Sequence, residues 1–268
     1  MSLLEVQDLC KWFPGMSHAA VDHVTLDVRT GECLGIVGGS GSGKSTLAGL
    51  MVGLIAPDSG SITIDGAAVS GKRGREGAAR GRLIQVVFQD HADTFNPRMS
   101  VGASVREFGL LAGMGKREAR KRSEELFERV GLDSSLLSHR PSRLSGGQRQ
   151  RAAIARALMS DPDFLVCDEI TSALDVSLQA GIANLVKEIA RTKGVVFITH
   201  DLALLDVVCD QVAVMHEGRV VERGAVHQVT AHPQDAYTKL LIASVLPVAR
   251  AAGTIEGEAK GLGDSRRL

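Results

Sequence analysis

The sequence predicts an α/β fold with a mostly parallel sheet, and three observations support this prediction. An apolar run at Cys33–Val37 ends in a glycine-rich turn and is followed by a helical pattern, which gives a strand–loop–helix unit. Strands alternate with helices again after residue 163, as they do when helices cover both faces of a parallel sheet. Between these parts, residues 91–162 have helical patterns and no convincing strand, so we expect an inserted helical subdomain.

The N-terminal elements follow from short-range patterns. Apolar and polar residues alternate at Leu3–Gln7 and Val24–Val28, as in half-buried strands. Ser61–Ile64 and Leu83–Phe88 are predicted as further strands, and Ser45–Leu54 as a helix.

The later elements follow in order along the chain. The inserted segment contains two predicted helices, Lys116–Val130 and Ser145–Met159. The remaining elements are strands and helices in alternation: Phe164–Cys167, Ser177–Arg191, Val195–Thr199, Leu202–Val208 and Gln211–Met215. The basic stretch Gly71–Arg82 is predicted as a solvated loop, and the tail from Gly257 as disordered.

Bulk composition excludes several function classes. The chain has 31 basic and 31 acidic residues among 268, which argues against a general nucleic-acid binder. The cysteines are scattered without a C-x-x-C pair, so neither a disulfide nor a zinc framework is predicted, and we expect a reducing compartment. No signal peptide is visible, and no apolar run reaches the roughly 18–20 residues that span a bilayer. We therefore expect a soluble protein whose membrane role, if any, comes through a partner.

The glycine-rich turn carries the first functional motif. Gly38–Ser45 fits the pattern G-x-x-x-x-G-K-[ST] between a strand and a helix. Glycines allow the backbone N–H groups to wrap a phosphate, and the helix N-terminus attracts the anion. We expect Lys44 to reach the β- and γ-phosphates of ATP and the Ser45 hydroxyl to bind Mg²⁺. The predicted nucleotide-binding residues of this loop are Gly38, Gly39, Ser40, Gly41, Ser42, Gly43, Lys44, Ser45 and Thr46.

Two acidic residues end a predicted strand beside this loop. Asp168 and Glu169 follow the apolar run Phe164–Cys167. A carboxylate at this place can hold Mg²⁺ through water, and the next one can polarise an attacking water. We predict Asp168 as the metal-side acid and Glu169 as the catalytic base.

The segment Leu144–Gln148 carries a resemblance to a known family. Ser145 and Gln148 have the spacing of a capping box at the start of a helix. The pentapeptide also resembles the signature motif of ATP-binding cassette (ABC) proteins, and the family's other motifs stand around it in order across about residues 3–225. These are the phosphate loop, Gln89 of the Q-loop, the acidic strand end, Ser172–Asp175 of the D-loop, His200 of the switch region and Phe13, which matches the aromatic that stacks on adenine.

The resemblance implies a fold and a set of domains. It implies a RecA-like P-loop core with a mostly parallel sheet, an N-terminal antiparallel β subdomain and an inserted α-helical subdomain. The expected boundaries are 1–90 and 163–228 for the core with its β subdomain, 91–162 for the helical subdomain, 229–256 for a C-terminal extension and 257–268 for the tail.

It also implies a mechanism. Two subunits face head to tail, and each ATP lies between the phosphate loop of one and the signature motif of the other. The residues expected to touch the partner's ATP are Ser145, Gly146, Gly147 and Gln148. The expected catalytic residues are Glu169, His200, Gln89 and Lys44, and the expected Mg²⁺ ligands are Ser45, Gln89 and, through water, Asp168.

One position departs from the family pattern. Most relatives have proline directly after the catalytic glutamate, where this chain has Ile170. Because proline fixes φ, we expect the turn that carries Glu169 to be less rigid here, with activity retained and its rate altered.

Longer stretches resemble the oligopeptide, dipeptide and nickel importer branch. These stretches are Val86–Asp90 with Asn96–Arg98, Thr171–Ala180 and His232–Leu241. The implied cargo is a peptide or a nickel or metal chelate, and both stay open because the ATPase does not touch the cargo. The implied partners are a second, non-identical ATPase or a second copy, two permease subunits and, indirectly, a solute-binding protein, at the cytoplasmic face of the membrane.

Other readings remain. The main alternative is an ABC ATPase of an exporter or a free-standing cassette, although translation factors of that type carry two cassettes. DNA-repair relatives would insert long coiled coils or zinc-binding cysteines between the phosphate loop and the signature, and this chain has neither there. A P-loop kinase or GTPase would not need Leu144–Gln148 or Ser172–Asp175.

Overall fold

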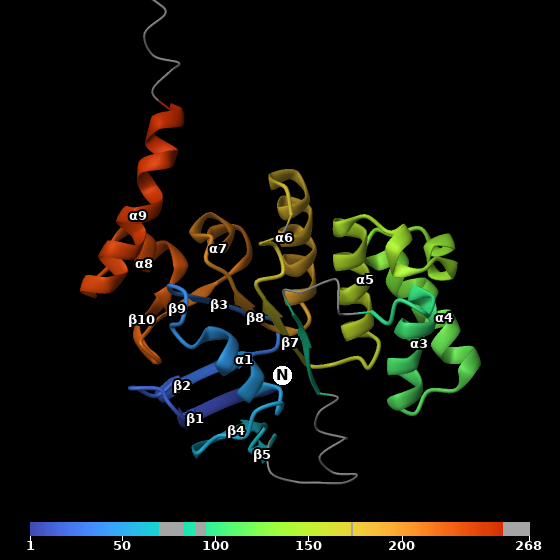
Figure 1. The fold of residues 1–268 in the computed structure, drawn as a ribbon, viewed down its shortest axis with the longest axis horizontal. Coiled ribbons are helices and arrows are strands. Elements are labelled where there is room, and N and C mark those ends of the chain that lie inside the picture. The colour runs from blue at the N-terminus through green and yellow to red at the C-terminus, as the bar shows by residue number, and fades with distance from the viewer. Residues whose placement is uncertain (70–82, 89–94, 173, 254–268) are drawn as a thin grey trace, which may run out of the picture.

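The computed structural model describes residues 1–69, 83–88, 95–172 and 174–253. It contains two sheets, with a group of helices at one end of the molecule (Figure 1). The smaller sheet has four antiparallel strands in the order β2-β1-β4-β5. Their bounds are β1 Leu3–Lys11, β2 Val21–Arg29, β4 Ser59–Ile64 and β5 Ala67–Ala68.

The larger sheet has six strands in the order β10-β9-β3-β8-β7-β6. The pairs β9–β3, β3–β8, β8–β7 and β7–β6 are parallel, and only β10 runs antiparallel to its neighbour. The bounds are β3 Cys33–Val37, β6 Ile84–Val87, β7 Phe164–Asp168, β8 Gly194–Ile198, β9 Gln211–His216 and β10 Arg219–Ala225. The mostly parallel sheet and the antiparallel β sheet are therefore confirmed.

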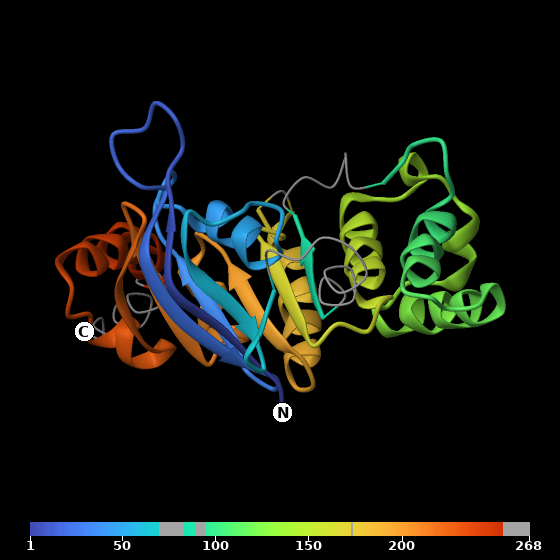
Figure 2. The same ribbon diagram turned by 90° about the horizontal axis from the view of Figure 1, so that it is seen from below.

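Helices cover the larger sheet and form the separate group. Their bounds are α1 Lys44–Met51, α3 Val101–Leu111, α4 Lys116–Arg129, α5 Gly146–Leu158, α6 Val176–Ala190, α7 Leu202–Val208, α8 Val226–Ala231 and α9 Ala236–Gly253, with 3₁₀ turns η1 Ser134–Ser138 and η2 Pro141–Arg143. Helices α3, α4 and α5 lie together at one end, away from the antiparallel sheet (Figures 1 and 2).

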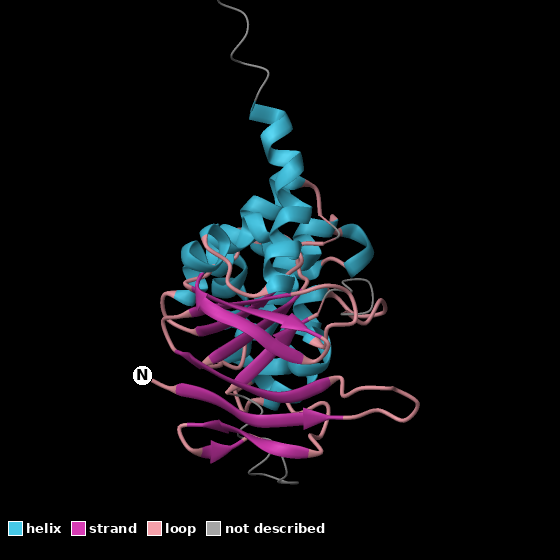
Figure 3. Cartoon of the chain, turned by 90° about the vertical axis from the view of Figure 1, so that its left-hand side faces the viewer, coloured by secondary structure: helices cyan, strands magenta, loops and turns pink. Residues whose placement is uncertain are grey.

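The core divides at the larger sheet because side chains alternate across a strand. In β3, Leu34 and Ile36 point to the layer that contains α1 and the antiparallel sheet, whereas Cys33 and Val37 point to the layer of α5, α6 and α7. Figure 3 shows the two sheets stacked, with most helices beyond the larger one. Burial on both faces explains why β3 is a continuous apolar run in the sequence.

Most predicted elements are present within one to four residues of their expected ends, and Cys33–Val37 and Leu202–Val208 match without change. Helix α3, strand β10 and helices α8 and α9 were not predicted as individual elements. The predictions for Gly71–Arg82 and for the tail 257–268 lie outside the described residues. No helix in the described part of the chain has both the length and the apolar content needed to cross a membrane.

Candidate nucleotide-binding site

The phosphate loop joins the C-terminal end of β3 to the start of α1. Gly43 stands directly before the helix with φ 101°, in the left-handed region that favours glycine. A Cβ at Gly43 would lie 2.1 Å from the carbonyl oxygen of Ala20, so the loop packs against the start of β2 at a distance that only glycine permits.

A pocket of about 490 Å³ opens over this loop. Residues from three parts of the chain line it: Phe13, Met16 and Ala20 from the β1–β2 connection, Ser40–Thr46 from the loop and α1, and Glu169 after β7. The predicted adenine-stacking residue and the predicted base thus lie on one cavity with the loop. Met16 was not predicted, and its place in the β1–β2 connection gives no local signal.

Lys44 is folded onto its own loop. Its side chain is buried, and Nζ donates hydrogen bonds to the carbonyl oxygens of Gly38, at 2.9 Å, and Gly39, at 2.8 Å. Burial lowers the pKa of Lys44, although the charges of Glu169 and Asp168 oppose this shift. The ammonium group is therefore held inside the pocket by the carbonyl oxygens of its own loop.

Asp168 and Glu169 face different neighbours. The Ser45 hydroxyl donates to Asp168 Oδ1 at 3.3 Å, which brings together two predicted Mg²⁺ ligands. Burial raises the pKa of Asp168 above its ordinary value. Glu169 Oε2 lies 3.8 Å from His200 Nδ1, so the predicted base and the predicted switch histidine are adjacent.

The turn after β7 is fixed without a proline. Glu169 has φ 48°, its N–H donates to the carbonyl of Ile198, and both the N–H and the hydroxyl of Ser172 donate to the carbonyl of Glu169. The Ile170 side chain is fully buried in the core layer of α5 and α6. Packing and hydrogen bonds thus restrain the segment that the sequence led us to expect as less rigid.

Ser145 caps α5 as predicted. Its hydroxyl accepts from the N–H of Gln148 at 3.3 Å, and the Gln148 side chain accepts from the N–H of Ser145 at 2.9 Å. Ser145 is exposed and is not among the residues that line the nucleotide pocket of its own chain. In Figure 1, β7 and α6 lie between α1, which follows the phosphate loop, and α5.

Two predicted motifs are incompletely described, and one contact was missed. Gln89 lies outside the described residues, as does Ala173 of the Ser172–Asp175 segment.

The contact that was not predicted is made by Tyr237, in the first turn of α9. Its hydroxyl accepts a hydrogen bond from the N–H of Gly39 at 2.7 Å. The two residues are 198 positions apart, so no local pattern could reveal this contact.

Comparison with known proteins agrees with this geometry. The family model described as ABC transporter matches residues 21–172, which include the phosphate loop, Leu144–Gln148 and Glu169. The chain belongs to the ABC transporter family. A Brucella ovis relative, named a peptide import ATP-binding protein, is 39% identical over 91% of this chain and 78% of its own.

Two solved structures are similar in fold and sequence. The post-hydrolysis dimer of the ATP-binding cassette MJ0796, bound to ADP and Pi, has a TM-score of 0.73 and 29% identity over 83% of this chain and 98% of its own. CbiO1 of Clostridium perfringens, part of the ABC transporter complex CbiONQ, has a TM-score of 0.75 and 30% identity over 93% of this chain and 97% of its own. The chain is thus an ATP-binding ABC ATPase of the kind that serves transport systems.

Proposed function

We propose that this ABC ATPase hydrolyses Mg-ATP to drive the import of peptides. The names of the similar relatives support a peptide cargo over a nickel chelate. The observation that carries the proposal is that Lys44 and Glu169 line one pocket with Phe13, and that Ser45 of the same pocket donates a hydrogen bond to Asp168. The capped end of α5 stays exposed and does not line this pocket.

The residues present fit Mg²⁺. This cation prefers oxygen ligands, and the Ser45 hydroxyl and the Asp168 carboxylate lie together beside the phosphate loop. We assign Ser45 as a direct ligand, Asp168 as a ligand through water, and Gln89 as the third contributor. When bound, the cation would neutralise charge on the phosphates. The raised pKa of Asp168 in the absence of a cation is the cost of burying a carboxylate, which a cation would offset.

In the proposed mechanism Lys44 exchanges its two carbonyl acceptors for the β- and γ-phosphates. Loop and helix N–H groups hold the phosphates in place, and catalysis is mainly positioning and charge stabilisation. Glu169 polarises the attacking water. His200, whose Nδ1 lies 3.8 Å from Glu169 Oε2, would contact the γ-phosphate. Phe13, which lines the pocket, would stack on the adenine.

We propose that two such chains enclose ATP between them. Ser145 is exposed at the N-terminus of α5, where N–H groups and the helix dipole attract an anion, yet it does not line its own pocket. A partner's γ-phosphate would be that anion, with Gly146, Gly147 and Gln148 around it. The dimeric state of the similar MJ0796 cassette supports this arrangement. The partner is a non-identical ATPase or a second copy.

The remaining assignments concern the permease. We propose that residues 1–90 and 163–228 form the motor core, 91–162 the signature-bearing helical subdomain and 229–256 an extension. A pocket lined by Leu54, Phe88, Phe108 and Arg156, with Leu54 and Phe88 exposed, lies where the core meets the helical subdomain. We propose that a membrane permease subunit docks there and holds the ATPase at the cytoplasmic face, with a solute-binding protein delivering the cargo.

Reconstitution tests the transport proposal. The ATPase is combined with the permease subunits and the binding protein encoded beside it, and ATP turnover is measured with peptides and with nickel chelates. We expect peptides to stimulate turnover. Stimulation by chelates alone would overturn the peptide assignment, and purified chains that bind ATP but never hydrolyse it with all partners present would overturn the ATPase proposal.

A further inference from the structure

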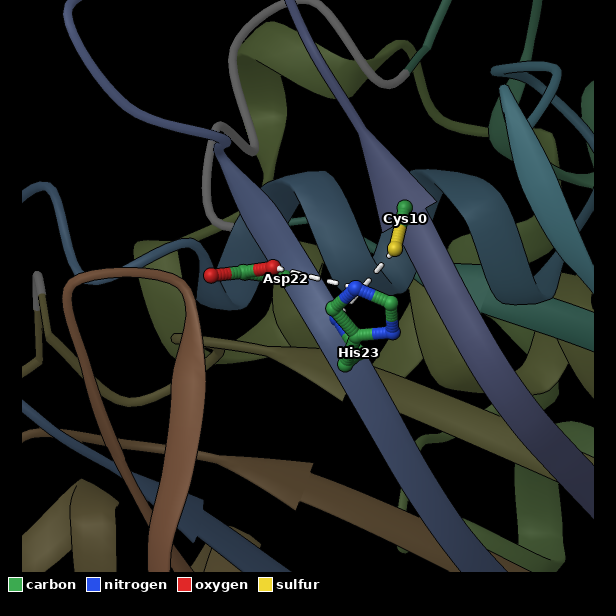
Figure 4. Close-up of side chains that lie close together, drawn as sticks. All are labelled: Cys10, Asp22 and His23. Atoms are coloured by element: carbon green, nitrogen blue, oxygen red, sulfur yellow. Dashed lines mark hydrogen bonds and ion pairs between the residues drawn. The ribbon is translucent and has the colours of Figure 1, made fainter.

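A group of polar side chains outside the nucleotide site lies where β1 and β2 diverge. Cys10 comes from β1, and Asp22 and His23 come from β2 (Figure 4). One ligand atom from each of the three lies within 4.8 Å of the other two, and within the described residues this is the one group of three histidine, cysteine or acidic side chains that meets this condition.

The distances are close to those of a metal site. His23 Nε2 lies 3.9 Å from Asp22 Oδ1, and the Cys10 sulfur points to the same space from the neighbouring strand (Figure 4). Tetrahedral Zn²⁺ with ordinary bond lengths holds such atoms about 3.4–3.6 Å apart. The ligand atoms therefore need to approach by only about 1 Å, within the reach of side-chain rotation. The main-chain N–H of His23 donates to Cys10 Sγ at 3.3 Å, which holds the sulfur beside the histidine.

Two further residues orient the ligands. Asp8 accepts a hydrogen bond from His23 Nδ1, which leaves Nε2 free of a proton in the neutral ring and turned to Asp22 and Cys10. Carboxylates that hold the second nitrogen of a ligating histidine in this way are usual around zinc. Arg219 donates to Asp22 Oδ2 at 2.6 Å and leaves Oδ1 for the site.

The backbone is shaped for this arrangement. Asp8 and His23 both have φ 50°, a left-handed conformation that is uncommon for residues other than glycine. The β1–β2 pairing also shifts register between Val6 and Leu9 and again between Leu9 and Lys11. Such bulges re-aim side chains, and strained backbone is found preferentially at functional sites.

The charges match a divalent cation. With a Cys10 thiolate and a neutral imidazole, Cys10, Asp8 and Asp22 contribute three negative charges and Arg219 one positive charge, which leaves minus two. Thiolate and imidazole ligands select cations of the zinc type, whereas Mg²⁺ prefers oxygen.

We propose that Cys10, Asp22 and His23 form a binding site for a zinc-type divalent cation, with Asp8 and Arg219 as positioning residues. Three protein ligands leave the fourth position to water. The cation would cross-link β1 and β2, the two strands joined by the loop that contains Phe13 and Met16. This loop is already closed by a hydrogen bond from the N–H of Ala20 to the carbonyl of Lys11. The site thus lies at the base of one wall of the nucleotide pocket, apart from the predicted Mg²⁺ ligands.

Cobalt(II) titration of the full chain, free of nucleotide and stripped with a chelator, tests the proposal. We expect one Co²⁺ per chain, an absorption band of thiolate-to-cobalt charge transfer, displacement of Co²⁺ by Zn²⁺, and no competition from excess Mg²⁺. Cys10→Ala should abolish the band, and Asp22→Asn and His23→Asn should each weaken binding at least tenfold. Asn suits the φ of position 23, where the side chain is exposed, and Asp22→Asn keeps the size of the partly exposed side chain at position 22, so we expect both variants to fold. Asp8→Asn should weaken binding by about 10- to 100-fold through the histidine.

His18→Asn is the matched control, because His18 is an exposed histidine of the same loop outside the group. Its Co²⁺ affinity should equal that of the wild type. Absence of the charge-transfer band in the wild type, or binding that survives in His23→Asn and is lost in His18→Asn, would overturn the proposal.

Discussion

Removing one hydroxyl group from the C-terminal segment should weaken ATP binding. Tyr237 accepts the N–H of Gly39 at 2.7 Å, and its ring stacks on His216 with centroids 3.8 Å apart and planes 15° from parallel. Tyr237→Phe keeps the stacked ring and deletes only the hydrogen bond. The phosphate loop then loses one restraint, although no residue that lines the nucleotide pocket has changed.

The magnitude follows from the contact. A neutral hydrogen bond contributes about 1 kcal/mol net, which sets an effect on ATP affinity of roughly fivefold if the whole restraint serves phosphate binding. The same loss should lower Tm by roughly 2–4 °C. Isothermal titration of the nucleotide and thermal unfolding measure both quantities, and Tyr237→Ala should exceed Tyr237→Phe because it also removes the stack.

Thr230→Val provides the control. The Thr230 hydroxyl donates to the carbonyls of Val226, at 2.9 Å, and His227, at 3.4 Å, both within α8. This variant therefore also removes side-chain hydrogen bonding to the backbone, but none to the phosphate loop. We expect its ATP affinity to equal that of the wild type. If Tyr237→Phe binds ATP as the wild type does, or if Thr230→Val weakens binding equally, the proposed restraint on Gly39 is wrong.

Three further predictions concern the pocket and its support. Lys44→Ala should weaken ATP binding by about 100-fold or more, because charge-assisted hydrogen bonds contribute about 1.5–3 kcal/mol each. Calorimetry measures the ATP affinity, with Lys187→Ala at an exposed site as the control. A near-normal ATP affinity of Lys44→Ala would refute the phosphate-binding role of Lys44. Ile170→Ala should lower the free energy of unfolding by about 2–5 kcal/mol, because Ile170 is fully buried. Val176→Ala at an exposed site should change the free energy of unfolding little. Equal denaturation midpoints for the two variants would contradict this prediction. Because burial raises the pKa of Asp168, this carboxyl takes up a proton at a higher pH than an ordinary aspartate as the solution is acidified, so Mg²⁺ affinity should fall earlier on acidification. A metal titration of the ATP complex across pH would detect this, and an affinity that is constant through the weakly acidic range would count against it.

The parts of the fold that the sequence predicted are those with strong local patterns. Strand β3 is buried on both faces, so its apolar run is unbroken, and Ser145 and Gln148 satisfy a capping box by themselves. Strand β10 was missed because it is an edge strand of mixed composition, Arg219–Ala225, in which no residue is fully buried. Its place depends on pairing with β9.

The residues of the site also divide into those with a local sequence pattern and those brought together only by the fold. The phosphate loop and the acidic strand end are contiguous in sequence, so their motifs were visible, and the family resemblance supplied Phe13 and His200. The Tyr237–Gly39 contact joins segments 198 residues apart, and the Cys10–His23 group depends on bulges in the β1–β2 pairing. Contacts of this kind arise from tertiary packing and leave no spacing pattern in the chain.

The most direct measurement is a structure of the assembled Glu169→Gln variant loaded with Mg-ATP. This substitution removes the proposed base, so ATP should remain intact and hold the pair of subunits closed. We predict that Ser145 Oγ lies within hydrogen-bonding distance, about 3 Å, of the γ-phosphate bound by the opposite subunit's Lys44. A closed, ATP-loaded pair in which Ser145 faces solvent or protein, far from any phosphate, would contradict the account.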